Sequence, residues 1–431
     1  MSRVNPFRPN SHVGPGMFAG RLSQLRALED ALRQTREGRP KSFMLTGERG
    51  IGKTSLLQYF KWIAQGHIDV DGAKMKFLVV DLDVDVSSTD LGLVRRVNLA
   101  LSRELARTEP ARSFLATGWD FLRRLEAFGL SLRDEPKPTD AETLHDEFAH
   151  SLAATCNRIA EADAKSVFGA RYDGLVLLID EADNAPKALR LGSFLKLLVE
   201  RVQRHGCEHL MVGLAGMPTL REVLRESHPS SLRVFDELPL DTLSREEVSW
   251  VIDRALTEGN ETSGEQTAID DGGRAALINL SEGYPHFIQQ FGYSAFSADT
   301  DLIIDVEDVR RGAFGPLGAM EKIGDRYYRD DFYKKIQKDS YRQVLRIMAD
   351  DENRLVSKQA IRSKFRGKTG TLDNAIHALR ERKIILAKEG ERGTYRLQHR
   401  GFAFWIKLYT SSPQGLEGQI GATAGDQEPA T

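Results

Sequence analysis

The sequence predicts an α/β protein with a parallel, doubly wound sheet, followed by a helical region and a terminal module of three helices and a hairpin. Apolar runs of strand length recur between helical patterns, which is typical of a parallel sheet covered by helices on both faces. These runs stop near Leu243, and amphipathic helices follow as far as residue 338. Beyond that point, three short helices precede two strand-like runs, which favours a winged helix-turn-helix.

The composition is that of an ordinary globular protein. The 431 residues leave room for roughly two to four domains, with 41% hydrophobic and 28% charged residues. The formal net charge of −2 argues against a chain that is basic throughout, so any affinity for nucleic acid must come from a local patch. Cys156 and Cys207 are too few for a disulfide scaffold, and the ten histidines show no zinc-binding spacing. We expect a cytoplasmic protein, since neither a signal peptide nor a membrane span is evident.

The stretch from Lys41 to Leu57 carries a phosphate-binding motif. Apolar residues 43–45 predict a strand that runs into a glycine-rich loop and then a helix. The glycines of such a loop let backbone N–H groups point at phosphate oxygens, while the lysine reaches the β- and γ-phosphates and the hydroxyl binds Mg²⁺. The sequence therefore predicts a site for ATP and Mg²⁺. Its residues are Gly47, Glu48, Arg49, Gly50, Ile51, Gly52, Lys53, Thr54 and Ser55.

A second apolar run, residues 174–179, ends in the acidic pair Asp180 and Glu181. At the carboxyl end of a strand beside the phosphate loop, Asp180 is expected to order the Mg²⁺ shell together with Thr54. Glu181 lies one residue further and is the candidate base that polarises the attacking water, while Lys53 stabilises the transferred phosphate. An apolar run ending in two acids is weak evidence by itself, and it gains weight from the phosphate loop upstream.

Changes of character along the chain define further regions. Residues 4–16 are rich in Pro, Asn and Gly and form an extended lead-in before an amphipathic helix from residue 22 to 37. Residues 107–172 form a long, mostly helical insertion whose role the sequence does not reveal. We expect an arm and lead-in helix at 1–40, a nucleotide-binding core at 41–243, a helical lid and linker at 244–338, a winged helix at 339–410 and a disordered tail at 411–431.

The expected winged helix is locally basic. Between residues 356 and 409, thirteen lysines and arginines stand against four acidic residues, a local charge of +9. The third helix of such a module, here 371–382, normally enters the major groove of DNA. The expected contacts to double-stranded DNA are Lys368 just before this helix, Asn374, His377 and Arg380 on it, and Arg392 near the backbone at the hairpin tip.

Together, these motifs resemble AAA+ ATPases, specifically their origin-recognition-type and STAND-like branch, over roughly residues 5–410. The resemblance rests on the two motifs above, on residues 233–247, which are similar to the strand-turn-helix joining core to lid, and on Phe18-Ala19-Gly20-Arg21 and Gly283-Tyr284-Pro285. It implies that Phe18 and Pro285 lie against adenine and that Arg233 reaches the γ-phosphate of a neighbouring subunit. It also implies that the protein can form a homo-oligomer.

The sequence departs from the family pattern at two sensor positions. Members of the family usually place a polar residue at the end of the strand after the acidic pair, whereas this chain has Ala215, Gly216 and Met217. Many lids supply an arginine next to the proline, whereas Pro285 is followed by His286. Both departures favour slow hydrolysis, used as a switch, over fast motor turnover.

Three functions are compatible with these patterns. The first is a slowly hydrolysing ATPase switch that binds DNA through its winged helix. The second is a STAND-like signalling or scaffold protein whose winged helix contacts protein, because a charged run is often only a solvated face. The third keeps the nucleotide as a structural ligand without turnover. The basic patch favours the first, and the sequence leaves the DNA sequence, the partner and the pathway undetermined.

Overall fold

The computed structural model describes residues 3–11, 20–70, 72–127, 138–351, 355–382, 384–388, 391–398 and 400–410. It divides into two compact units, which are treated separately below. The core unit is Gly20–Asp241. The lid unit joins Met1–Ala19 to Thr242–Thr431 and therefore contains both ends of the chain. Two of the sequence predictions, Phe18 and the tail from residue 411, lie outside the described residues.

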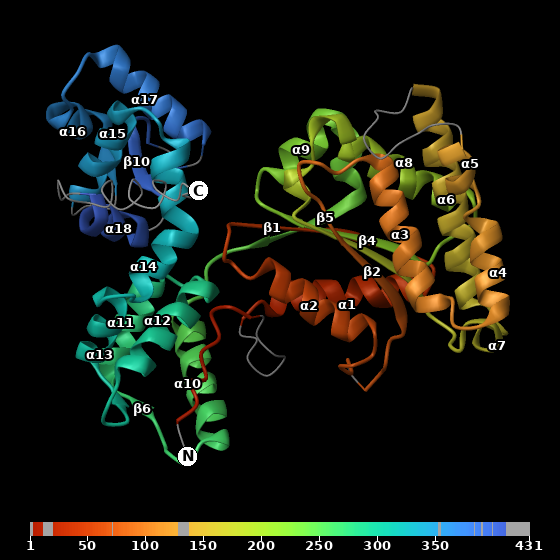
Figure 1. Cartoon of the computed structure of the whole chain (residues 1–431), viewed down its shortest axis with the longest axis horizontal. Helices are drawn as coiled ribbons and strands as arrows, with labels where there is room; N and C mark the ends of the chain where they lie inside the picture. Colours follow the sequence, from red (N-terminus) through yellow and green to blue (C-terminus); the bar gives the residue numbers. More distant parts are fainter. Residues whose placement is uncertain are drawn as a thin grey trace, which may run out of the picture. The chain divides into compact units, whose positions relative to one another are not determined.

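The core unit is built on a five-stranded parallel sheet with the order β2-β3-β4-β1-β5, which confirms the predicted parallel α/β fold (Figure 1). Almost every position of the inner strands is buried, as the continuous apolar runs predict for strands covered on both faces. The strands are β1 (Ser42–Gly47), β2 (Phe77–Asp83), β3 (Gly174–Asp180), β4 (Leu210–Gly216) and β5 (Phe235–Leu240).

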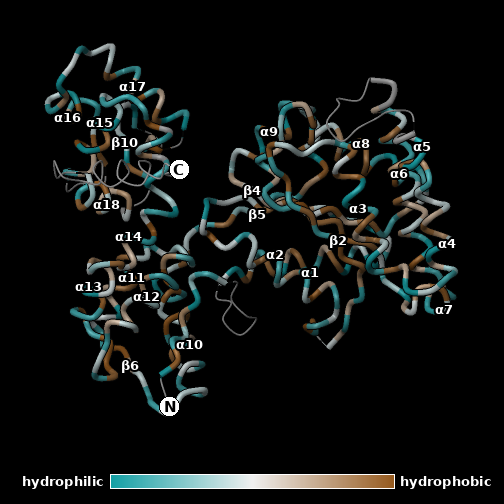
Figure 2. Tube along the Cα trace, viewed as in Figure 1, coloured by the Kyte–Doolittle hydropathy of each residue, from teal (hydrophilic) through white to brown (hydrophobic). Residues whose placement is uncertain are grey.

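Helices cover both faces of this sheet (Figure 1). On one face, α1 (Leu22–Arg36) and α2 (Lys53–Ala64) pack against the strands, with the ring of Phe60 5.0 Å from that of Phe43. On the other face a single hydrophobic cluster joins strands β2, β3 and β4 to the helices, and the central strands are among the browner parts of Figure 2. These helices are α3 (Asp90–Leu105), α6 (Pro138–Ala160), α8 (Leu191–Arg204) and α9 (Leu220–Ser227).

The insertion between β2 and β3 is helical, as predicted. Besides α6 it contains α4 (Glu109–Gly118), α5 (Phe121–Ala127) and α7 (Ala164–Phe168). Trp119, which follows α4, is buried and lies 6.0 Å, ring to ring, from Phe148 of α6. The insertion therefore belongs to the hydrophobic core of this unit. Within the described parts of the chain, none of the helices is long and apolar enough to cross a membrane.

The lid unit contains the predicted helical region. The capping box at Ser244 and Glu247 is present, because each side chain accepts a hydrogen bond from the backbone N–H of the other residue. The helices are α10 (Arg245–Thr262), α11 (Asp271–Ser281), α12 (Pro285–Ala298), α13 (Val306–Phe314) and α14 (Ala319–Ile323).

One prediction for this region is wrong. No strand was expected before the C-terminal module, but β6 (Ala268–Ile269) and β7 (Ile303–Ile304) form a small parallel pair. Each strand has only two residues, which is too short for an alternating pattern to appear in the sequence. Their pairing joins segments 35 positions apart in register, Ala268 with Ile303, so only the tertiary structure defines it.

The N-terminal segment packs into the lid unit. Arg3 forms an ion pair with the buried carboxylate of Asp299 and donates to the carbonyl of Phe296 at 2.6 Å. Phe7 is 1% exposed and fills the space above Gly292, where an added Cβ would lie 2.4 Å from the ring. Arg326 donates to Pro9 O and Asn10 Oδ1 at 3.4 and 2.7 Å. The first residues are therefore part of the lid unit rather than a separate arm.

The C-terminal part of this unit holds the elements on which the winged-helix prediction rests. Helices α15 (Asp339–Asp350), α16 (Lys358–Lys364) and α17 (Thr369–Glu381) precede strands β9 (Ile385–Ala387) and β10 (Thr394–Leu397). Two elements were not predicted: β8 (Val356–Ser357), which completes an antiparallel sheet of order β8-β10-β9, and α18 (Arg400–Thr410). Two π-helical turns, Gly324–Tyr328 and Asp331–Lys335, connect this part to α14.

A single added methyl group tests the packing of the sheet. Strand β4 lies between β3 and β1, and a Cβ at Gly213 would lie 2.4 Å from the ring of Phe43 and 2.7 Å from Leu178. Gly213→Ala is therefore expected to destabilise the protein by about 1–3 kcal/mol, measured by urea denaturation. Gly118→Ala is the matched control, because nothing lies within 4 Å of its added Cβ. Equal stabilities of the two variants would contradict this packing.

Candidate nucleotide-binding site

The phosphate loop connects β1 to α2, as the sequence predicts. Gly50 and Gly52 have φ angles of 79° and 99°, in the left-handed region that glycine adopts at little cost. A Cβ at Gly47 would lie 2.8 Å from Ile51 Cγ2 and 3.1 Å from Leu240 O. The loop is therefore compact, and its chain enters the first turn of α2 with N–H groups that have no helical acceptor. Such a turn favours a bound phosphate.

Lys53 lies within this loop. Its Nζ donates to the carbonyl oxygens of Gly47 and Glu48 at 2.9 and 3.0 Å. Burial lowers the pKa of the Lys53 amine, whereas the negative charges of Asp183, Asp180, Glu181 and Glu48 raise it. A nucleotide phosphate would add a further negative charge beside this amine and favour its charged form. The geometry thus places a cation where the β- and γ-phosphates are expected.

Thr54 and Asp180 meet in the structure. The hydroxyl of Thr54 donates to Asp180 Oδ2 at 2.8 Å, and the backbone N–H of Glu181 donates to Asp180 Oδ1 at the same distance. One hydroxyl and one carboxylate form the all-oxygen donor set that Mg²⁺ prefers. The residues present therefore fit a magnesium ion held jointly by the phosphate loop and the end of β3.

Glu181 has an unusual backbone conformation. Its φ and ψ angles are 51° and 30°, in the left-handed region that few residues other than glycine occupy. The residue is exposed, and Oε2 accepts a hydrogen bond of 3.2 Å from Asn184 Nδ2. Left-handed residues of this kind often occur at functional sites, where the surrounding structure holds them. The turn thus holds the Glu181 carboxylate at the end of the sheet, and its role as a base stays a prediction.

Asp183 explains the absence of a polar residue at the end of β4. Its Oδ1 accepts a hydrogen bond from the backbone N–H of Met217 at 2.9 Å. A Cβ at Gly216 would lie 2.7 Å from the same oxygen, so no larger side chain fits there without displacing Asp183. The polar group at this strand end therefore comes from the turn after β3 (Ala182–Asn184), not from β4 itself.

Arg21 connects the start of α1 to the phosphate loop. This residue has a φ of 63° and immediately precedes α1, and its Nη2 donates to the carbonyl of Ile51 at 3.2 Å. The residue just before α1 therefore contacts the phosphate loop. The sequence prediction for its neighbour Phe18 concerns a residue outside the described ranges.

The remaining predicted residues lie further from this cluster or in the other unit. Arg49 is exposed on the loop, and Ser55 is half-buried in the first turn of α2. Arg233 is exposed in a short 3₁₀ helix, Pro229–Val234, directly before β5. Pro285 is the first residue of α12 in the lid unit, after a turn in which Gly283 O accepts from Leu243 N at 2.9 Å. Its place against a nucleotide stays a prediction.

The predicted DNA-contacting residues are all exposed. Asn374, His377 and Arg380 lie on the side of α17 opposite its buried residues, which are Leu372, Ala375, Ile376 and Leu379. Lys368 is the residue before α17, and Arg392 lies beside Gly393 in the turn that leads into β10. They therefore belong to the lid unit, apart from the nucleotide cluster.

Three residues of the site were not predicted from the sequence: Arg21 had been used only as part of a motif, and Asp183 and Asn184 had no role. The sequence signal for Asp183 and Asn184 is the polar stretch from Asp180 to Asn184, which continues past the acidic pair. Only the structure shows that Asp183 reaches Met217 and that Asn184 holds Glu181.

Comparisons with known proteins agree with this geometry. Residues 17–212 match the AAA ATPase domain family. The structure is similar to that of the Aeropyrum pernix ORC2 protein in its ADPNP-ADP complexes, with 13% sequence identity, a TM-score of 0.51 and coverage of 91% of this chain and 93% of that chain. It is also similar to Cdc6p from Pyrobaculum aerophilum, with 14% identity, a TM-score of 0.46 and coverage of 94% and 97%. No curated protein matches significantly.

A further similar structure is the Aeropyrum pernix ORC1 protein in complex with DNA, with 16% identity, a TM-score of 0.42 and coverage of 91% and 94%. The family match spans both the phosphate loop and the Asp180–Glu181 pair. The similarity to ORC2 extends over both units of the chain. Residues 17–212 are therefore similar to the AAA ATPase domain family, and the chain has the fold of the Aeropyrum pernix ORC2 protein.

Proposed function

We propose that this protein is an ATP-dependent switch that hydrolyses its nucleotide slowly and binds double-stranded DNA through its C-terminal part. The contact between Thr54 and Asp180 carries the first half of the proposal, because it brings the loop that binds phosphate to the acids that bind the metal. ATP with Mg²⁺ is the ligand that uses both groups at once.

The chain's own residues suggest how the reaction proceeds. Lys53 would exchange its bonds to the loop carbonyls for the β- and γ-phosphates, and Thr54 and Asp180 would hold Mg²⁺, which would offset the phosphate charge. Glu181 would accept the proton of the attacking water, and the hydrogen bond from Asn184 to its Oε2 orients the carboxylate. No polar group on β4 assists at Gly216, since Asp183 fills that space. This arrangement supports slow turnover.

The connections between the two units support control by the nucleotide. The chain passes between them after Ala19 and after Asp241. The first connection runs directly into Arg21, which contacts the phosphate loop, and the second leads to Leu243, whose N–H bonds to Gly283 beside Pro285. ATP and ADP would thus favour different arrangements of the lid.

The surface of α17 supports the DNA half of the proposal. Its outer face presents the amide of Asn374, the imidazole of His377 and the guanidinium of Arg380, groups that suit base edges and phosphates, beside the exposed acids Asp373 and Glu381. Part of the basic charge is used internally: Lys358 pairs with Asp373 at 2.7 Å, and Arg362 donates to Gly367 O at 2.9 Å. Lys368, Arg380 and Arg392 remain exposed at the positions expected to contact DNA.

A protein partner is the second candidate for this surface. The guanidinium of Arg380 lies over the ring of Tyr395, 6.0 Å from its centroid, so it also contributes to packing within the subdomain. On this view the chain is a STAND-like signalling or scaffold protein. The two candidates differ in salt dependence, because phosphate contacts release counterions and protein contacts largely do not.

Two substitutions separate binding from hydrolysis. Lys53→Ala is expected to abolish ATP binding, since it removes the cation beside the phosphates. Glu181→Gln is expected to retain binding and to lower turnover by about 10²-fold or more, because the base is lost. Calorimetry measures ATP binding, and phosphate release measures turnover. Lys187→Ala, which changes an exposed lysine, is the control. Wild-type turnover in Glu181→Gln would remove this residue from the role of base.

A salt titration tests the DNA interface. For wild type, the logarithm of duplex affinity should fall linearly with that of salt concentration, and Arg380→Ala with Arg392→Ala should reduce the slope by about 1 to 2. The matched control is Arg310→Ala, an exposed arginine that pairs with Glu307 on α13. Absence of duplex binding at low salt, or an unchanged slope in the double variant, would favour the protein partner.

Assembly is tested through Arg233. If this exposed arginine completes the site of a neighbouring subunit, turnover per chain should rise with protein concentration, and Arg233→Ala should lower the plateau by about tenfold or more. Arg204→Ala, an exposed arginine at the end of α8, should behave as wild type. Turnover that is independent of concentration and unaffected by Arg233→Ala would show that the site works within one chain.

A further inference from the structure

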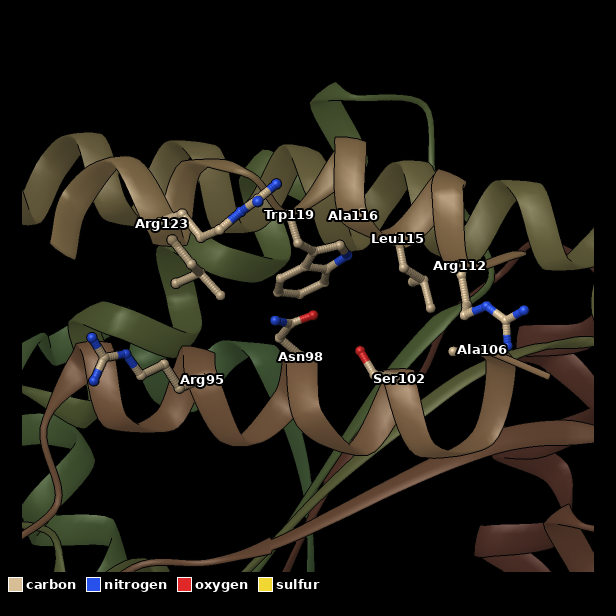
Figure 3. Close-up of a pocket in the computed structure, with 10 residues that line it drawn as sticks. Arg95, Asn98, Ser102, Ala106, Arg112, Leu115, Ala116, Trp119 and Arg123 are labelled. Atoms are coloured by element: carbon tan, nitrogen blue, oxygen red, sulfur yellow. The ribbon is translucent and has the colours of Figure 1, made fainter. Parts of the chain in front are cut away.

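A cavity with a mixed polar and apolar lining lies in the core unit, where α3 meets the helical insertion. It has a volume of about 420 Å³ and opens between α3 on one side and α4 and α5 on the other (Figure 3). None of the residues of the phosphate loop or of the turn after β3 lines it. This volume lies within the range of small-molecule sites. The cavity is therefore a candidate for a ligand other than the nucleotide on Lys53.

The two walls of the cavity differ in chemistry. Asn98 and Ser102 point from α3 toward the indole of Trp119, which lies on the opposite wall with Leu115 (Figure 3). The indole is held in place, because it is buried and its Nε1 donates to Thr155 Oγ1 at 3.2 Å. The cavity thus offers a rigid aromatic and aliphatic wall facing an amide and a hydroxyl. Such walls suit a flat ring with polar atoms on its edge.

The charge of the lining is entirely positive. Arg95, Arg112 and Arg123 all line the cavity, with Arg95 and Arg123 toward one end and Arg112 toward the other (Figure 3). Among the residues that the structure describes, no aspartate or glutamate lines it. A guanidinium binds phosphate oxygens in pairs, which gives both charge and direction.

Two acids compete for Arg112 and Arg123 from outside the cavity. Glu109 accepts from Arg112 at 2.7 Å, and Asp120 pairs with Arg123 at 2.7 Å. Both pairs join residues three apart on exposed surface, and pairs of this kind contribute little to stability because water and salt screen them. A ligand phosphate can therefore displace either acid at small cost.

We propose that this cavity binds an organic phosphate of nucleotide size, with its ring beside Trp119 and Asn98 and its phosphate on Arg95 and Arg123. The apolar wall of Trp119 and Leu115 can pack against the ring, and the amide and hydroxyl of the other wall can bind its polar edge. The arginines can bind the phosphate oxygens. The cavity's size favours one nucleotide over a longer chain. This ligand is independent of the nucleotide on the phosphate loop, and its site is formed by α3 together with the insertion for which the sequence showed no role.

The test uses the full chain carrying Lys53→Ala, so that the phosphate loop does not bind the added nucleotide. Calorimetric titrations with AMP, GMP, CMP and UMP are compared with titrations of the matching nucleosides and of inorganic pyrophosphate. At least one monophosphate should bind once per chain and tighter than its nucleoside and than pyrophosphate. Absence of binding by all four overturns the proposal, as does equal binding of pyrophosphate, which would reveal only a phosphate patch.

Variants of the lining locate the site. Asn98→Asp keeps the shape but adds a negative charge, and Arg123→Gln removes a positive one, so each should weaken binding by about tenfold or more. Asp120→Asn removes the competitor of Arg123 and should strengthen binding by about twofold to fivefold. The control is Arg103→Gln, an exposed arginine of α3 outside the lining. Unchanged affinity in the first two variants, with unfolding temperatures like the control, would contradict the site.

Discussion

The hydrogen bond between Thr54 and Asp180 is the contact on which the nucleotide site depends. It joins the ends of two strands that are separated by a third strand in the sheet. In the sheet order β3-β4-β1, the strand that ends in Asp180 and the strand that leads into the phosphate loop are not neighbours. Strand β4 lies between them, and its end must leave room for the acidic turn. Glycine at position 216 provides that room, because the carboxylate of Asp183 lies where a side chain would begin.

The same constraint leaves no room for a polar sensor at position 216. A side chain there would compete with Asp183 for the same space. Asp183 binds the backbone of Met217 and contributes negative charge near Lys53, but it offers no donor to a phosphate when ionised. Its presence is consistent with a site that binds nucleotide firmly and turns it over slowly.

Much of the core unit could be predicted from the sequence, because its strands are buried on both faces and read as unbroken apolar runs. Lys53, Thr54 and Asp180 could also be predicted, because the phosphate-binding motif and the acidic end of an apolar run are local patterns in the sequence. The contacts of Arg21, Asp183 and the β6–β7 pair could not be, since each joins segments that are distant in sequence or only two residues long. Such contacts depend on tertiary packing, which no local pattern encodes.

The most direct test of the switch is the affinity for duplex DNA with different nucleotides bound. Glu181→Gln loaded with ATP is compared with wild type loaded with ADP, at one salt concentration. If the nucleotide controls the C-terminal surface, the two affinities should differ by about fivefold or more, and DNA should shift the ATP-to-ADP preference by the same factor. Equal affinities in the two nucleotide states would contradict the account, however tightly each nucleotide binds.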